Sequence, residues 1–172
     1  SDFAVARLNP DGSPDATFNP GSNGRYTRDF DLGNDVANAV VFQPGIGIVV
    51  AGGGGLQESF AALRLNFTGT LDASFGSGGI AQAAFPGCIA RIAPSRSGGV
   101  WLLGAYDLLT SGAFLARLDA SGRLDTAFGQ GGLAFGAFAR VPPVELQDGR
   151  ILAVGSGFSL VRLLPNGAID AT

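Results

Sequence analysis

The sequence contains no histidine, lysine or methionine, and Cys88 is the single cysteine among its 172 residues. Without histidine, neither a Ser–His nor a Cys–His nucleophilic pair can be built, and the usual zinc sites lack their ligands. One cysteine cannot form an internal disulfide. All eleven basic residues are arginines, the net charge is −3 and no basic run is present. This charge pattern offers nothing to a nucleic-acid backbone, so no nucleic-acid partner is expected.

Long apolar runs are also missing, since no stretch approaches the ~18 consecutive apolar residues of a membrane span. We therefore expect no membrane span. The chain is nevertheless 46% hydrophobic, with 28 glycines and thirteen phenylalanines. The glycines separate short apolar runs, as tight turns between many short strands require, and no long helical stripe interrupts them. The composition and its punctuation predict an all-β fold.

A motif with Arg at its first position, Gly five places later and Asp eight places later recurs along the chain. It stands at residues 7–15, 64–72, 117–125 and 162–170. A period of roughly 45 to 57 residues is typical of repeat architectures. Four short apolar runs separated by turns fill a complete interval between copies. Four antiparallel strands per repeat are the signature of a β-propeller blade, which is the fold we predict.

We expect one repeat domain over residues 1–172, divided into four segments. Residues 1–35 form a partial blade with the third and fourth strands, 36–85 and 86–138 form complete blades, and 139–172 form a partial blade with the first three strands. The chain then holds about three to three and a half blades, fewer than the four to eight with which propellers usually close. Because both ends fall inside a repeat, we expect a part of a larger ring, or a ring completed by other copies.

The repeat resembles a known family. Residues 60–79 and 114–132 carry Arg-Leu-Asn or Arg-Leu-Asp, a turn glycine, an Asp and a Phe-Gly-x-Gly-Gly end, and residues 43–52 carry Gln-Pro ahead of Ile-Val-Val-Ala-Gly. This pattern resembles the delta-60 repeat family of bacterial β-propellers. The first copy departs from it after Phe18, and the last stops before its Phe. The resemblance implies a propeller of large secreted or surface proteins in bacteria, with no assigned activity and no catalytic residues.

The Arg and the Asp of each copy are expected to face each other across a hairpin turn. The Arg ends one strand and the Asp follows the turn, and a guanidinium matches a carboxylate in shape and charge. We predict that each pair is a structural clasp; a ring of arginines that binds an anionic ligand is the alternative. The pairs are Arg7 with Asp15, Arg64 with Asp72, Arg117 with Asp125, and Arg162 with Asp170.

Two further kinds of site come from the turns and the variable connections. Asn9, Asp11, Ser13 and Asp15 stand at alternate positions, as the oxygen ligands of calcium loops do, so calcium is a candidate near Asn9, Asp11 and Asp15. The third copy has Arg123 inside the corresponding turn, which is incompatible with a calcium role common to all copies. We predict no other cofactor. Variable connections carry the binding residues of propellers. The candidates in them are Tyr26, Glu58, Tyr106 and Asp107; Trp101 lies within a strand and is expected in the core.

These features predict a non-catalytic β-propeller scaffold, extracellular or on the bacterial cell surface, that mediates adhesion. Its partner would be a protein, a glycan or other copies of itself. A structural subunit of an extracellular assembly or filament is one alternative, and exposed apolar ends would favour it. A propeller hydrolase or lyase acting on polysaccharide is the other. Carboxylates clustered on one channel, from among Glu58, Asp107 and Glu145, would favour that enzyme.

Overall fold

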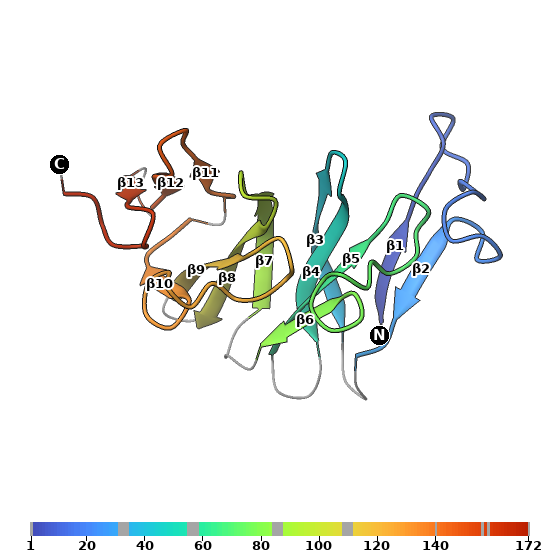
Figure 1. Ribbon diagram of the computed structural model, residues 1–172, viewed down its shortest axis with the longest axis horizontal. Helices are drawn as coiled ribbons and strands as arrows, with labels where there is room; N and C mark the ends of the chain where they lie inside the picture. The colour runs from blue at the N-terminus through green and yellow to red at the C-terminus, as the bar shows by residue number, and fades with distance from the viewer. Residues whose placement is uncertain are drawn as a thin grey trace. The chain divides into compact units, whose positions relative to one another are not determined.

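The computed structural model describes residues 2–30, 35–54, 59–83, 88–107, 112–139, 141–155, 157 and 159–171. Within these ranges there are thirteen strands in four sheets, every strand pairing is antiparallel, and no α-helix occurs (Figure 1). A helix capable of crossing a membrane is accordingly absent from the same ranges. The chain divides into two compact units, Ser1–Pro86 and Gly87–Thr172.

The first unit contains a two-stranded and a four-stranded sheet. β1 pairs with β2, and the larger sheet has the strand order β3-β4-β5-β6. Phe3 and Phe18 from the smaller part pack into one core cluster with Val50 and Leu63 of the larger sheet. The bounds are β1 Phe3–Ala6, β2 Arg25–Arg28, β3 Val36–Gln43, β4 Gly47–Gly54, β5 Ser59–Leu65 and β6 Ile80–Ala83.

The inner strands β4 and β5 are apolar because each is hydrogen-bonded on both edges and packed on its faces. Val49, Ala51 and Leu63 are fully buried. Gly52 stands where β3 has a bulge between Ala37 and Ala39. A Cβ at Gly52 would lie 1.9 Å from the Val36 carbonyl oxygen, so the close approach of the two strands requires glycine.

The second unit contains a four-stranded sheet of order β10-β9-β8-β7 and a three-stranded sheet of order β11-β12-β13. Trp101, Leu115 and Phe128 share a core cluster with Ile151 and Leu163 from the smaller sheet. Trp101 is fully buried, which confirms that it belongs to the core. The bounds are β7 Cys88–Pro94, β8 Val100–Asp107, β9 Gly112–Leu118, β10 Leu133–Gly136, β11 Val144–Glu145, β12 Ile151–Val154 and β13 Leu160–Leu163.

The all-β fold of four-stranded antiparallel sheets is confirmed at β3–β6 and at β7–β10. Neighbouring strands of each sheet are also consecutive in the chain, so each antiparallel pair is joined directly, without a crossover. β1 and β2 lie within residues 1–35, and β11 to β13 lie within residues 139–172. β13 begins at Leu160, and Phe158 lies outside the described residues.

Candidate functional site

The four recurring turns have one backbone design. Their glycines have positive φ, from 78° to 84°, a conformation that strongly favours glycine. In each turn the glycine N–H donates to the carbonyl of the residue two places after the Arg, over 2.8–3.0 Å. The Asp N–H donates to the carbonyl of the Arg itself, for example Asp72 to Arg64 over 2.8 Å. The backbone thereby places the first and last residues of the motif opposite each other.

The side chains of these residues form an ion pair in every copy. Nε of Arg7, Arg64 and Arg162 each lies 2.7 Å from the Oδ2 of its aspartate. Nε of Arg117 donates to Asp125 over 2.9 Å, and its Nη2 contacts the same oxygen. In the fourth copy Arg150 also reaches Asp170 over 3.3 Å, while pairing with Asp148. The structure therefore brings together the members of all four predicted pairs.

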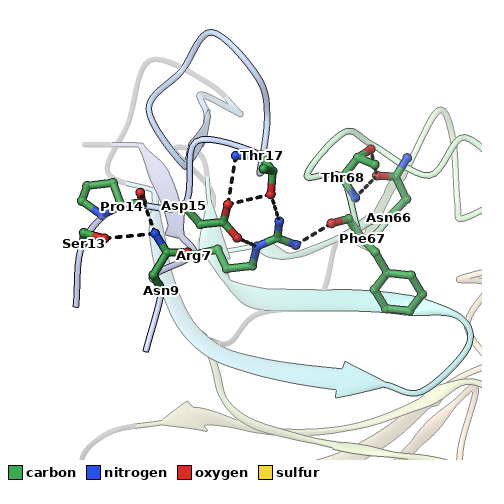
Figure 2. A network of polar contacts seen from close by, with 9 residues as sticks. All are labelled: Arg7, Asn9, Ser13, Pro14, Asp15, Thr17, Asn66, Phe67 and Thr68. Carbon is green, nitrogen blue, oxygen red and sulfur yellow. Dashed lines mark hydrogen bonds and ion pairs between the residues drawn. The ribbon is translucent and has the colours of Figure 1, made fainter. Parts of the chain in front are cut away.

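A hydroxyl completes the pair in the first two copies. The Thr17 hydroxyl and N–H both donate to Asp15 Oδ1, over 2.6 and 2.9 Å, and Arg7 donates to the same hydroxyl over 2.8 Å (Figure 2). These Thr17 hydrogen bonds, with Arg7, hold the pKa of Asp15 below its ordinary value. Ser74 has the same place beside Asp72, and its hydroxyl is the main cause of the lowered pKa of Asp72.

Each of the first three guanidinium groups also covers an aromatic ring. Arg7 lies 4.8 Å from the centroid of Phe18, and Arg64 lies 4.8 Å from that of Phe75. Arg117 lies over both Trp101, at 5.0 Å, and Phe128, at 5.7 Å. The ring, the carboxylate and the hydroxyl together engage the guanidinium, and only 5% of the Arg64 side chain is exposed. This geometry favours a structural role over an anion site.

The recurring turns also join neighbouring repeats inside each unit. Asn19 N–H donates to the Thr68 carbonyl over 2.6 Å, and Arg7 Nη1 donates to the Phe67 carbonyl over 2.6 Å. Figure 2 shows the Arg7 side chain reaching from its own turn to the turn that holds Phe67. The second unit repeats the backbone contact, because Gly129 N–H donates to the Asn166 carbonyl over 2.7 Å.

The aromatic residue of one repeat rests on the turn glycine of the next. A Cβ built at Gly69 would lie 2.8 Å from the Phe18 ring, and one built at Gly167 would lie 3.0 Å from the Phe128 ring. The same construction at Gly12 meets nothing within 4 Å. Glycine thus has two tasks at residues 69 and 167, the positive φ and the ring contact. We call this arrangement of backbone hydrogen bond, ring and glycine the repeat joint.

The residues proposed for calcium do not fit a calcium site. Both oxygens of Asp15 accept hydrogen bonds, from Arg7 and Thr17. Asp11 Oδ1 accepts from the Ser13 N–H and hydroxyl, and the Asn9 amide nitrogen donates to Ser13 and to the Pro14 carbonyl. A cation would have to displace Arg7 from its carboxylate. No grouping of three or more His, Cys, Asp or Glu side chains fit to hold a metal occurs in the described ranges.

The candidate binding residues lie in different settings. Tyr26 lies in strand β2 rather than in a loop and packs against the core cluster of the first unit. Burial raises the pKa of its phenol, and the charge of Arg28 offsets part of that effect. Glu58 lies outside the described residues. Tyr106 and Asp107 end strand β8, and their side chains are outside the described part of the structure.

Glu145 has a structural role that the sequence did not indicate. Its Oε2 accepts hydrogen bonds from the Trp101 indole over 2.9 Å, from the Ser95 hydroxyl over 3.0 Å and from the Arg96 N–H over 3.0 Å. Burial alone would raise the pKa of Glu145, but these three hydrogen bonds and the charge of Arg117 lower it. Through this one oxygen the carboxylate links β11 to the β7–β8 hairpin.

The antiparallel four-stranded sheets, the repeating turns and the repeat joints define a β-propeller repeat protein, with two four-stranded, one three-stranded and one two-stranded sheet among the described residues. The family described as "Domain of unknown function (DUF5122) beta-propeller" matches residues 1–18 and 146–172, the first and last copies of the motif. The match supports a β-propeller repeat family for this chain. No curated protein matches the sequence.

Proposed function

We propose that the protein is a non-catalytic propeller scaffold that binds a protein or a glycan outside the bacterial cell or on its surface. The observation that supports this role is the internal use of the recurring polar residues. In each copy of the motif the Arg and the Asp form an ion pair with each other. Glu145 likewise accepts three hydrogen bonds from residues of the β7–β8 hairpin. The residues that recur maintain the scaffold, which leaves partner contacts to the variable connections.

The extracellular location is supported by the resemblance to the delta-60 repeats of secreted and surface proteins. Tyr106 and Asp107, at the end of β8, remain our candidates for contact with the partner, together with Glu58. Aromatic residues dominate the energetics of many interfaces, and Tyr supplies a large rigid contact area.

The test has a binding arm and an activity arm. The purified protein is applied to a glycan array and to whole bacterial cells, and in parallel to polysaccharides with detection of new reducing ends. We expect binding without cleavage, and we expect Tyr106→Ala to weaken the binding at least tenfold while leaving the thermal midpoint unchanged. If the protein cleaves a polysaccharide and Asp107→Asn abolishes the cleavage, the proposed scaffold function is wrong and the protein is a polysaccharide hydrolase or lyase.

A structural subunit of an extracellular assembly is the second candidate, and one observation favours it. Val40 and Phe42 on β3 are 63% and 60% exposed, and Phe67, whose ring lies 5.6 Å from that of Phe42, is 41% exposed. Apolar side chains gathered on one strand mark an interaction surface. Light scattering over a range of protein concentrations tests this role: self-association that is lost in Val40→Ser supports it, and a monomer at every concentration rejects it.

A further inference from the structure

The β7–β8 hairpin directs three hydrogen-bond donors at one oxygen of the next sheet along the chain. Oε2 of Glu145 accepts from the Trp101 indole over 2.9 Å and from the Ser95 hydroxyl over 3.0 Å. The Arg96 N–H donates to the same oxygen over 3.0 Å. Trp101 and Ser95 are buried, so these donors have fixed places in the fold. Because Glu145 lies in β11, this hairpin recognises a carboxylate on the sheet that follows its own.

The β3–β4 hairpin corresponds to β7–β8 in the repeat but lacks two of these donors. Val49 of β4 pairs with the arginine of its motif as the tryptophan of β8 does, so Val49 holds the place of the indole. The hairpin turns also correspond, because the carbonyls of Gln43 and Ser95 each accept from the N–H three residues later. Pro44 therefore stands at the place of Arg96, and proline has no N–H to donate. Of the three donor positions, the one held by Gln43 alone keeps a polar group.

The acceptor differs between the repeats in a matching way. Phe42, Pro94 and Glu145 hold equivalent ladder positions, because the partner of each pairs in turn with the leucine that follows a motif arginine. Phe42 and Pro94 have apolar side chains and need no donor. Pro94 lies in the sheet that comes after β3–β4 in the chain, and Glu145 lies in the sheet that comes after β7–β8. The hairpin with three donors is thus followed by a carboxylate, and the hairpin without them by a proline.

We propose that Glu145 determines which hairpin the β11–β13 sheet docks on during folding. Chains of similar repeats are prone to wrong docking between repeats, and the repeat joint occurs in both units, so it does not distinguish one repeat from another. On β7–β8 the Glu145 carboxylate has three donors; on β3–β4 it would keep at most one and lose hydration without compensation. A penalty on the wrong pairing gives specificity, and fixing register is the best-attested role of such polar contacts. A boundary without the carboxylate still has its joint but no such preference.

The test follows the indole, because Trp101 is the single tryptophan of the chain. Correct docking of the β11–β13 sheet covers this ring, whereas docking on the other hairpin leaves it open to solvent. The intact chain is unfolded in urea and refolded by dilution, and quenching of its tryptophan fluorescence by acrylamide is then measured. The wild type should show one protected population. Glu145→Leu removes the carboxylate and keeps an apolar side chain, so it should add a second population that is quenched at least fivefold faster.

Three further variants separate docking from stability. Glu145→Gln keeps an acceptor oxygen for the same donors and should show one protected population. Ile151→Val destabilises the same sheet by loss of a buried methyl group and leaves the donors in place, so it should also show one. Ser95→Ala removes one donor and should show a smaller second population, which keeps the test decisive if Glu145→Leu does not fold. The proposal is overturned if Ser95→Ala or a folded Glu145→Leu gives a single protected population, or if Ile151→Val or Glu145→Gln gives the second one.

Discussion

The backbone N–H of Asn19 donates to the carbonyl oxygen of Thr68 over 2.6 Å, across 49 positions of the chain, and so joins the first recurring turn to the second. The equivalent residues Gly129 and Asn166 make the same contact over 2.7 Å. In both joints a phenylalanine ring lies against the glycine that follows the carbonyl. The joint therefore depends on main-chain atoms and on the absence of one Cβ.

Gly69→Ala and Gly12→Ala are a matched pair that measures the joint. Both glycines have nearly the same φ, 84° and 83°, so alanine pays the same backbone strain of about 1 kcal/mol at each. At residue 69 the added methyl also meets the Phe18 ring and Asn19 N, an overlap that costs about 1–3 kcal/mol more. Urea unfolding should show the larger loss for Gly69→Ala. Equal losses in the two variants would contradict the joint.

Replacing a motif arginine is expected to lower stability. Arg64→Leu should reduce the free energy of unfolding by about 2 kcal/mol, because Asp72 loses a charge-assisted hydrogen bond and keeps the weaker one from the Ser74 hydroxyl. Arg117→Leu should act in the same direction, with a smaller effect since its side chain is 22% exposed. Arg96→Leu, at an exposed position, is the control and should change little. Unchanged thermal unfolding of both motif variants would refute the clasp.

Glu145 predicts a pH dependence with a defined sign. The pKa of Glu145 is lower in the folded state than in the unfolded state. The ionised carboxylate therefore stabilises the fold at pH values above the unfolded-state pKa, and this stabilisation is lost as the pH falls through the folded-state pKa. Glu145→Gln should therefore destabilise the protein at pH 7, by about 1–2 kcal/mol for hydrogen bonds to a partly exposed carboxylate. The difference between wild type and variant should shrink at pH 3, as measured by urea unfolding at both pH values. A difference that stays constant with pH would show that ionised Glu145 does not stabilise the fold.

Removal of divalent cations is expected to have no effect on stability. Asp15 is engaged by Arg7 and Thr17, and Asp11 by Ser13, so the first turn is held by its own donors. The thermal midpoint should be the same in millimolar calcium and in excess chelator. A thermal midpoint that rises with calcium in the wild type and not in Asp11→Ala would support the calcium site after all.

Much of the fold was predictable because the repeat places glycine, Arg and Asp at fixed intervals. The turn geometry follows from a glycine at positive φ, and the ion pairs follow from the backbone bonds that set Arg64 opposite Asp72. The ladder strands were evident because apolar runs such as residues 48–51 stand between turn residues. The division into segments at residues 36, 86 and 139 stays a prediction, as does the binding role of Tyr106 and Asp107.

The rest depends on contacts between residues that are distant in the chain. Glu145 and Trp101 are 44 positions apart, and nothing in either local sequence indicates that the carboxylate accepts the indole N–H. The ring contacts of the arginines were missed for a related reason: Phe18 and Phe75 recur in the motif, but recurrence alone does not say what a ring touches. The calcium hypothesis was based on the spacing of oxygen-bearing side chains, and the sequence does not indicate that hydrogen-bond donors of the same turn already bind these oxygens.

The repeat joint has a consequence for how such chains evolve. Its attachment uses peptide groups, a ring and a bare α-carbon, and both the ring and the glycine occupy positions that recur with the motif. Duplicating or deleting a whole unit in the gene would therefore recreate a working seam without compensating substitutions. The number of repeats in such a chain can therefore change one repeat at a time, while the sequences of the exposed connections diverge freely.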